Sequence, residues 1–100
     1  MSLQIQKTAG STTTLALSGR LDTTTAPELE AALADAASAK ELVLDMNELA
    51  YISSAGLRVI LKAQKTMLGV GGTMKLTHVS ETVQEVFDIT GFSDFLTIEK

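Results

Sequence analysis

The spacing of apolar side chains changes along this chain, and it predicts strands in some segments and helices in others. Residues 3–7 and 13–17 alternate apolar and polar side chains, and Gly10-Ser11 lies between the two segments. Alternation with a period of two is typical of half-buried strands, and a short turn between two such strands indicates a hairpin. The chain is therefore predicted to begin with two antiparallel strands, and residues 19–22 are expected to lead out of the second.

The middle of the chain, residues 42–46, is a nearly unbroken apolar run. Such a run suits a strand that is buried on both faces, so we expect a central strand there, followed by a short linker over residues 47–50. Residues 74–79 alternate again and predict a further strand. The short apolar segment 92–98 suits a final edge strand.

The segments between these strands carry apolar residues at helical spacing. A first helix is expected from about residue 26 to about residue 39, because Thr25 and Glu28 have the spacing of a capping box and Pro27 fits a first turn. A second helix is expected over residues 54–70.

Glycines and a serine mark the ends of the remaining helical segments. Gly71-Gly72 is typical of a helix C-terminus, Ser80 is a good N-cap for a third helix, and that helix is expected to stop at Gly91. The side chains expected on the buried helix faces are Leu29, Ala32, Leu33 and Ala36 in the first helix, Leu57, Ile60, Leu61, Met67 and Leu68 in the second, and Val83, Val86 and Phe87 in the third.

This order of elements, β-β-α-β-α-β-α with the short final strand as an addition, predicts an α/β fold. One hundred residues suffice for a single domain, here 1–100, with no separate second core. Strands joined by helices pair in parallel through right-handed crossovers, so we expect a mixed four- to five-stranded sheet with helices packed on it. Working sites in such sheets lie where strands end and helices begin, and the loops at 22–25 and 51–54 are expected to be neighbours.

Composition and charge narrow the classes of function. The chain has no cysteine, which excludes disulfides and thiolate chemistry. A net charge of −4 without a Lys/Arg cluster interleaved with aromatics argues against direct binding of nucleic acid. No apolar run approaches the roughly 20 residues that span a bilayer, and residues 1–6 have no secretory pattern, so no membrane insertion is expected. The sequence favours a cytoplasmic protein that meets other proteins.

Catalytic constellations are weak in this sequence. His78 is the single histidine, and neither it nor Asp45 belongs to a recognisable metal or Ser–His–Asp motif. The glycine-rich segment 69–72 lacks the Lys-Ser/Thr that completes a phosphate-binding loop. We therefore expect neither enzymatic activity nor a cofactor or metal.

The paired serines Ser53 and Ser54 allow two interpretations. Either hydroxyl can cap the second helix, which is a common structural role worth about 1 kcal/mol. The same helix N-terminus favours a phosphate, so a serine there is also suited to phosphorylation. The basic residues Arg58, Lys62 and Lys65 share one face of this helix and suit either a solvated surface or a docking surface for an acidic partner.

Three segments together resemble the STAS domain, and within it the bacterial anti-sigma factor antagonists. They are Gly19-Arg20-Leu21-Asp22 before the first helix, Ser53-Ser54-Ala55-Gly56-Leu57 before the second, and the last helix, 83–91, followed by Phe92. The resemblance covers the whole chain. It implies a STAS-type domain, and it implies that Ser54, or with less support Ser53, matches the family's phosphorylated serine. This sequence has Ser53 where the family often has Asp, and Ala55 where the family often has Ser or Thr.

The resemblance also implies a mechanism and partners. In the family, the unphosphorylated antagonist binds an anti-sigma factor with serine kinase activity, which frees a sigma factor; phosphorylation ends the binding, and a serine phosphatase of the PP2C type reverses it. The partner-binding residues expected here are Asp22, Thr23, Ser53, Ser54, Gly56, Leu57 and Arg58. Two alternatives are an accessory STAS subunit of a transport complex, for example for lipids, and a STAS module that senses a small ligand.

Overall fold

One five-stranded sheet and three α-helices make up the computed structural model, which describes residues 3–36 and 39–99. The elements in chain order are β1 (Leu3–Thr8), β2 (Thr13–Leu21), α1 (Ala26–Asp35), β3 (Glu41–Ile52), α2 (Ser54–Gly69), β4 (Thr73–Thr77), α3 (Glu81–Thr90), a 3-10 turn η1 (Phe92–Asp94) and β5 (Thr97–Glu99).

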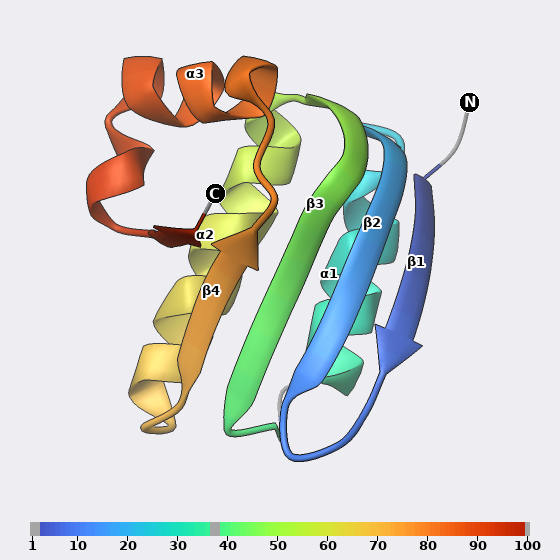
Figure 1. Ribbon diagram of the computed structural model, residues 1–100, viewed down its shortest axis with the longest axis vertical. Coiled ribbons are helices and arrows are strands. Elements are labelled where there is room, and N and C mark those ends of the chain that lie inside the picture. Colours follow the sequence, from blue (N-terminus) through green and yellow to red (C-terminus); the bar gives the residue numbers. More distant parts are fainter. Residues whose placement is uncertain (1–2, 37–38, 100) are drawn as a thin grey trace.

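The strands lie side by side in the order in which they occur in the sequence, β1-β2-β3-β4-β5 (Figure 1). The first two pair antiparallel, as the alternation at the start of the chain predicts, and every later pairing is parallel. The predicted mixed sheet is confirmed, and it has five strands.

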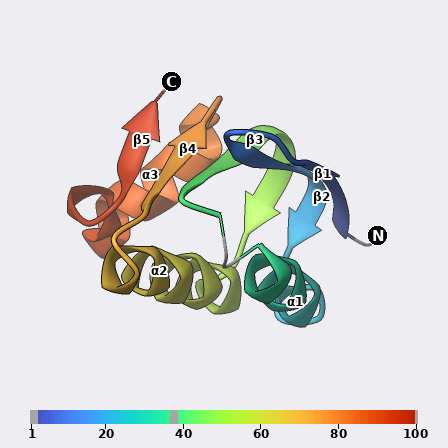
Figure 2. The ribbon, with the colours of Figure 1, turned by 90° about the horizontal axis from the view of Figure 1, so that it is seen from below.

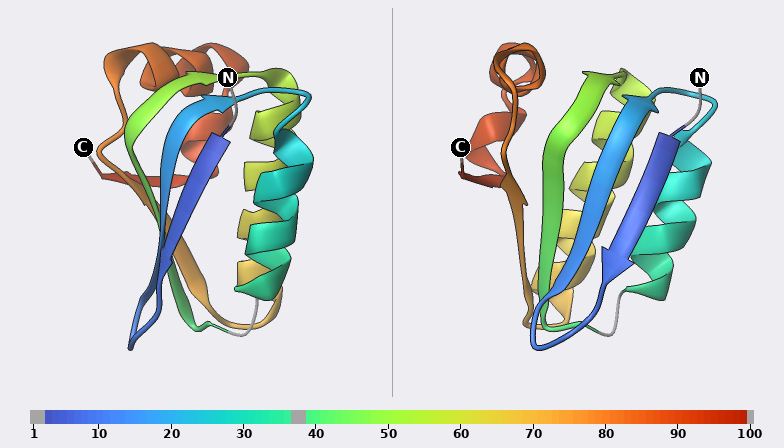
Figure 3. Two further views of the ribbon diagram at one scale, coloured as in Figure 1. Left: turned by 90° about the vertical axis from the view of Figure 1, so that its right-hand side faces the viewer. Right: turned by 45° about the vertical axis from the view of Figure 1, so that its right-hand side comes forward.

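The helices are distributed unevenly over the sheet. Figure 2 and Figure 3 show α1 and α2 side by side on one face, whereas α3 lies across the end of the sheet where β3 and β4 finish. In the part of the chain that the structure describes, no helix covers the opposite face. The prediction that 42–46 is buried on both faces is therefore wrong. Leu42, Leu44 and Met46 are buried, but Val43 and Asp45 on the other face are half-buried.

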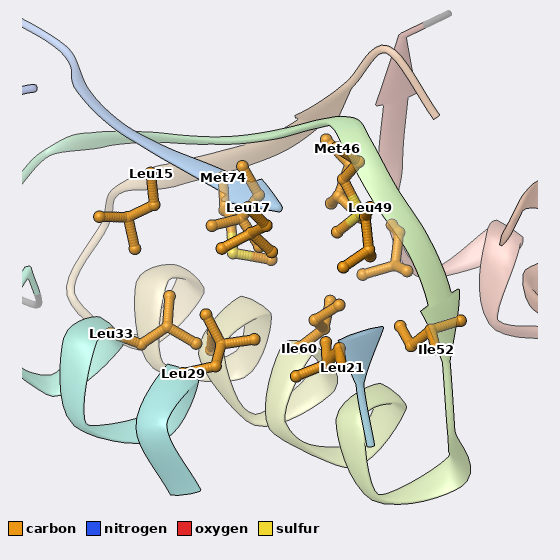
Figure 4. Close-up of a cluster of buried hydrophobic side chains, with 14 of the residues drawn as sticks. Leu15, Leu17, Leu21, Leu29, Leu33, Met46, Leu49, Ile52, Ile60 and Met74 are labelled. Carbon is orange, nitrogen blue, oxygen red and sulfur yellow. The ribbon is translucent and has the colours of Figure 1, made fainter. Parts of the chain in front are cut away.

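The core fills the space between the sheet and the two helices α1 and α2 (Figure 4). Most of the side chains expected on helix faces lie in it, but Leu68 does not: its exposed fraction is 64%. Ala63 is buried in α2 instead. The labelled members of the cluster are Leu15, Leu17 and Leu21 from β2, Leu29 and Leu33 from α1, Met46, Leu49 and Ile52 from β3, Ile60 from α2, and Met74 from β4.

Strands β2 and β3 are longer than the sequence pattern predicts. Residues 18–21 of β2 pair with residues 48, 49, 51 and 52 of β3, so segments 19–21 and 47–52 belong to strands and not to a loop and a linker. The pairing between the strands is interrupted twice, and each interruption adds one residue to β3: Ser18 faces Glu48, and Arg20 faces Tyr51. Such β-bulges bend a strand, and Figure 1 shows β3 curving toward α2 at its end.

Several helix ends follow the predicted signals. The Ser80 hydroxyl caps α3, and the N–H of Gly72 donates to the Met67 carbonyl at 2.7 Å, a C-terminal closure of α2 in which Gly71 takes part. The first helix ends at Asp35, earlier than expected, and residues 37 and 38 of the predicted extension lie outside the described part of the chain. The last segment, expected to be extended throughout, begins with the turn η1 before β5.

Candidate functional site

The ends of β2 and β3 lie together at one edge of the sheet, and each leads into a helix. Leu21, the last residue of β2, faces Ile52, the last residue of β3. The N–H of Ser53 donates to the Leu21 carbonyl at 2.8 Å, which joins the two junctions beyond the sheet. The expectation that the loops around 22–25 and 51–54 are neighbours is confirmed.

The two adjacent serines have different environments at the start of α2. Ser53 has an extended backbone and is the N-cap: its hydroxyl oxygen accepts from the N–H of Gly56 at 3.3 Å. Ser54 is the first residue of the helix, and its side chain is exposed. One serine thus supplies the cap, and its neighbour presents a hydroxyl to solvent beside the positive end of the helix dipole.

The close approach of α2 to the strands requires Gly56. A Cβ atom at this position would lie 2.5 Å from Cγ of Leu21 and 3.2 Å from Cγ1 of Ile52. Gly56 and its neighbour Leu57 are buried, so of the expected partner-binding residues these two lie beneath the surface. They fix the position of the first turn of α2 and with it the position of Ser54.

The loop before α1 is built around the side chain of Asp22. Its Oδ1 accepts from the backbone N–H groups of Thr24 and Thr25, each at 3.0 Å. The Thr25 hydroxyl donates to the Arg20 carbonyl at 2.8 Å and accepts from the N–H of Asp22 at 2.8 Å. The predicted capping box is therefore wrong, because Thr25 occupies the N-cap position but its buried hydroxyl closes the turn instead of capping α1.

These hydrogen bonds hold Asp22 in its charged form. The N–H of Thr25 contributes most to lowering the pKa of Asp22, the Thr25 hydroxyl, the N–H of Thr24 and the nearby Arg20 add to this effect, and partial desolvation opposes it. Thr23 and Thr24 are exposed next to it. Asp22 is thus a fixed negative charge at the edge of the site, and the same contacts make it part of the loop structure.

The exposed side chains of Arg20 and Tyr51 also lie at this edge, although they are not among the partner-binding residues expected from the sequence. The guanidinium carbon of Arg20 lies 4.2 Å from the centre of the Tyr51 ring, which is a stacking distance. The Nε of Arg20 lies 3.8 Å from Oδ2 of Asp22. Arg20 belongs to the motif that precedes the first helix, but its contact with Tyr51 depends on a strand register that sequence spacing does not reveal.

The basic residues predicted on one face of α2 have separate roles. Lys62 forms an ion pair with Glu30 of α1, with 3.2 Å between Nζ and Oε2, so it bridges the two helices. Arg58 is exposed one turn after Ser54 and therefore lies on the same side of the helix. The first turn of α2 contains no acidic residue. Arg20 beside Asp22 and Arg58 beside Ser54 are the two arginines of the chain, and they lie near the two strand-to-helix junctions.

Other chemistry is sparse in the described residues. Within 3–36 and 39–99, no three His, Cys, Asp or Glu side chains gather in a way that could hold a metal ion. His78 pairs with Asp45, with 3.2 Å between Nδ1 and Oδ1. None of the described helices is long and apolar enough to cross a membrane.

Comparisons with known proteins identify the family of this chain and agree with its fold. Residues 2–100 match the model of the STAS domain. BtrV of Bordetella bronchiseptica, an anti-sigma factor antagonist by provisional assignment, is 44% identical over 78 residues, which cover 76% of this chain and 67% of BtrV. The anti-sigma-B factor antagonist of Bacillus subtilis is 32% identical over 83 residues, which cover 82% of this chain and 76% of the relative.

Solved structures resemble the fold at lower sequence identity. An anti-sigma factor antagonist from Mycobacterium paratuberculosis has a TM-score of 0.87 at 18% identity and covers 97% of this chain and 85% of its own. The Bacillus cell fate determinant SpoIIAA in its phosphorylated form has a TM-score of 0.74 at 20% identity, with 98% and 91% covered. A sulfate transporter family protein from Wolinella succinogenes reaches 0.76 at 19% identity, with 86% and 74% covered. The fold alone is therefore shared by proteins of different function.

Proposed function

The chain belongs to the STAS domain family and to its anti-sigma factor antagonists, and we propose that its activity is switched at Ser54. Unphosphorylated, the protein binds an anti-sigma factor that has serine kinase activity, and the sigma factor held by that partner is released for transcription. Phosphorylation of Ser54 ends the binding, and a serine phosphatase of the PP2C type restores it. The observation that carries this proposal is the exposed Ser54 hydroxyl beside a separate cap, Ser53.

The division between the two serines supports Ser54 as the acceptor. The Ser53 hydroxyl is half-buried and holds the N–H of Gly56, so modifying it would cost the helix its cap. The Ser54 hydroxyl is exposed and can be modified without disturbing that hydrogen bond. Because the first turn of α2 has no acid of its own, the helix dipole there is open to a negative group.

A phosphate on Ser54 would change the surface and leave the fold intact. It would add a charge of about −1.5 to −2 at a helix end that favours anions. Arg58 lies one turn further along the same side of the helix, so its positive charge would attract the phosphate. We therefore attribute the switch to charge and bulk at the docking surface.

The exposed or half-buried residues around Ser54 form the docking surface in this proposal. They are Asp22, Thr23, Ser53, Ser54 and Arg58, and the buried residues Gly56 and Leu57 support them from beneath. SpoIIAA, which shares the fold, has been solved in both phosphorylated and unphosphorylated forms. The identities of 44% and 32% to antagonists favour this role over a transporter subunit, for which the likeness is one of fold. In this role the protein acts in the cytoplasm as a regulator, without catalysis or a cofactor of its own.

The first test is an intact-mass measurement. The protein is incubated with ATP and, separately, with each kinase-type anti-sigma factor encoded in the same genome. We expect a single phosphoryl adduct on the wild-type chain and on Ser53→Ala, and none on Ser54→Ala. An adduct that persists in Ser54→Ala and disappears in Ser53→Ala would move the site to Ser53, and the absence of any adduct would refute phosphorylation.

A binding measurement tests the second half of the proposal. Ser54→Ala should bind the anti-sigma factor as the wild type does, and Ser54→Asp should bind it more weakly, with unchanged far-ultraviolet circular dichroism. Equal affinity of the two variants would show that charge at Ser54 does not control the interaction.

A further inference from the structure

Arg20 and Tyr51 form an exposed stacked pair next to the proposed switch. The side chain of Arg20 is 48% exposed, and Tyr51 as a whole residue is 39% exposed, so both reach solvent at the edge where β2 and β3 end. An exposed Tyr is often a place where an interface forms, because its ring buries a large area at a small cost in conformational entropy. Tyr51 precedes the capping Ser53 by two residues, so the pair lies at the strand ends that lead into α1 and α2.

The strand register brings the two side chains together. Gly19 faces Leu49, but Arg20 faces Tyr51, because Ala50 is an extra residue in β3. Without this bulge, Arg20 would stand opposite Ala50. Gly19 has φ of +101°, a conformation that favours glycine, at the same point of β2. Bulges occur often beside functional sites, where they redirect a side chain.

The guanidinium of Arg20 is held in place but retains donor capacity. Tyr51 supports one face of it, and Asp22 lies 3.8 Å from Nε, beyond the range of a hydrogen bond. Within the described residues, the Arg20 side chain makes no hydrogen bond. Oδ1 of Asp22 is already engaged by the N–H groups of Thr24 and Thr25, which holds this carboxylate within its own loop. The planar guanidinium is therefore supported on one face by the Tyr51 ring, and its side chain remains about half exposed to solvent.

We propose that Arg20, stacked on Tyr51, is an anchor that binds a carboxylate of the anti-sigma factor; this inference rests on the proposed function. A guanidinium matches a carboxylate through two parallel hydrogen bonds, and a fork that is already oriented loses less entropy on binding. Arg and Tyr are also the residue types on which interface energy concentrates. The partner's contribution is an acidic side chain that docks beside Ser54.

The test is a calorimetric titration with each kinase-type anti-sigma factor of the same genome, with ADP present so that no phosphate is transferred. We expect Arg20→Ala to weaken binding by about 10- to 100-fold, as truncating an interface anchor does. Arg20→Lys should recover only part of this loss, because it keeps the charge but loses the planar fork. Tyr51→Phe keeps the ring and should bind as the wild type does, whereas Tyr51→Ala should weaken binding.

Lys75→Ala is the matched control. Lys75 has a similarly exposed side chain, 45%, and pairs with Glu99 at 3.4 Å, so its loss changes the net charge equally but on β4, away from the ends of β2 and β3. Raising the salt concentration should reduce the affinity of the wild type and of Lys75→Ala more steeply than that of Arg20→Ala. A merely structural role of Arg20 would not change this salt dependence, and urea unfolding of each variant checks the fold.

The outcomes separate this inference from the switch. If Arg20→Ala binds as tightly as Lys75→Ala while Ser54→Asp binds weakly, the anchor is wrong and the switch stands. If Arg20→Ala binds weakly while Ser54→Asp binds as the wild type does, the anchor stands and the switch is wrong. If the wild type binds none of the anti-sigma factors, both are wrong.

Discussion

The N-termini of α2 and α3 have the same local construction and different surroundings. In each, a serine with an extended backbone precedes the helix, Ser53 in one and Ser80 in the other. Each hydroxyl accepts from the N–H three residues later, that of Gly56 or that of Val83, and both distances are 3.3 Å. A serine cap by itself therefore does not distinguish a functional site from an ordinary helix start.

The difference lies in the residues around each cap. The first residue of α3 is Glu81, whose carboxylate already lies in the first turn, whereas the first residue of α2 is the neutral, exposed Ser54. Two strand ends converge on the α2 terminus, and Arg20 and Tyr51 stack beside it. The first helical residue and its neighbours across the sheet, and not the capping serine, therefore distinguish the two helix N-termini.

We expect substitutions at the third residue of α2 to change the free energy of unfolding most. Val83 in α3 fits its side chain into the core, but a Cβ at Gly56 in α2 would lie 2.5 Å from Cγ of Leu21. We expect Gly56→Ala to lower the free energy of unfolding by about 1–3 kcal/mol, because overpacking outweighs the gain in helix propensity. Urea unfolding measures it. Gly69→Ala in the same helix meets nothing within 4 Å and should be neutral or stabilising; an equal loss at both glycines would contradict the packing argument.

The two capping serines should contribute equally to the free energy of unfolding. Ser53→Ala and Ser80→Ala each remove one cap, so each should lower the free energy of unfolding by about 1 kcal/mol. Ser54→Ala removes no cap and should change it by less than about 0.5 kcal/mol. Chemical denaturation of the three variants under identical conditions tests this. A loss in Ser54→Ala as large as that in Ser53→Ala would mean that Ser54 contributes to the cap.

Much of this architecture follows from the sequence because it depends on local signals. The alternation at residues 3–7 and 13–17 indicates strands with one buried face. Ser80 and Gly71-Gly72 mark helix ends through hydrogen bonds to residues only a few positions away in the sequence. The neighbouring positions of the two strand-to-helix loops also follow, since parallel strands place their carboxyl ends at one edge. Ser54 could be singled out for the same reason: it belongs to a contiguous motif at a helix start.

The parts that could not be predicted depend on contacts between distant segments. In β3 the buried residues Met46, Leu49 and Ile52 are three apart, because each bulge inserts one residue, and this spacing does not resemble a strand. The contact of Arg20 with Tyr51 depends on one of these bulges. The sequence likewise allows the Thr25 hydroxyl either to cap α1 or to close the turn before it. Only the folded structure, in which this hydroxyl is buried and donates to the Arg20 carbonyl, shows that it closes the turn.

Substitutions that change the charge of the first residue of α2 and of α3 should change stability in opposite directions, because one adds an acid and the other removes one. Ser54→Asp gives α2 the first-turn acid that α3 already has, and it should raise the free energy of unfolding by about 0.3–1 kcal/mol at low salt. Glu81→Gln removes that acid from α3 and should lower it by a similar amount. Both differences should shrink as salt screens the dipole. If Ser54→Asp destabilised the protein, the α2 terminus would not be the open anion site that the switch requires.

A weaker dependence of the free energy of unfolding on pH should come from Asp22. This residue lies near the N-terminus of α2, but its hydrogen bonds stabilise the loop before α1. Its pKa is lowered in the folded protein, chiefly by the N–H of Thr25, so the folded state binds a proton less readily than the unfolded chain. The resulting stability is fully present above the ordinary pKa of 3.8 and is lost as the pH falls through the lower folded value. Asp22→Asn should therefore be less stable than the wild type near neutral pH, and the difference should narrow between about pH 5 and pH 2. Urea unfolding across this range measures it, and a difference that stays constant would show that the loop depends on the shape of the side chain and not on its charge.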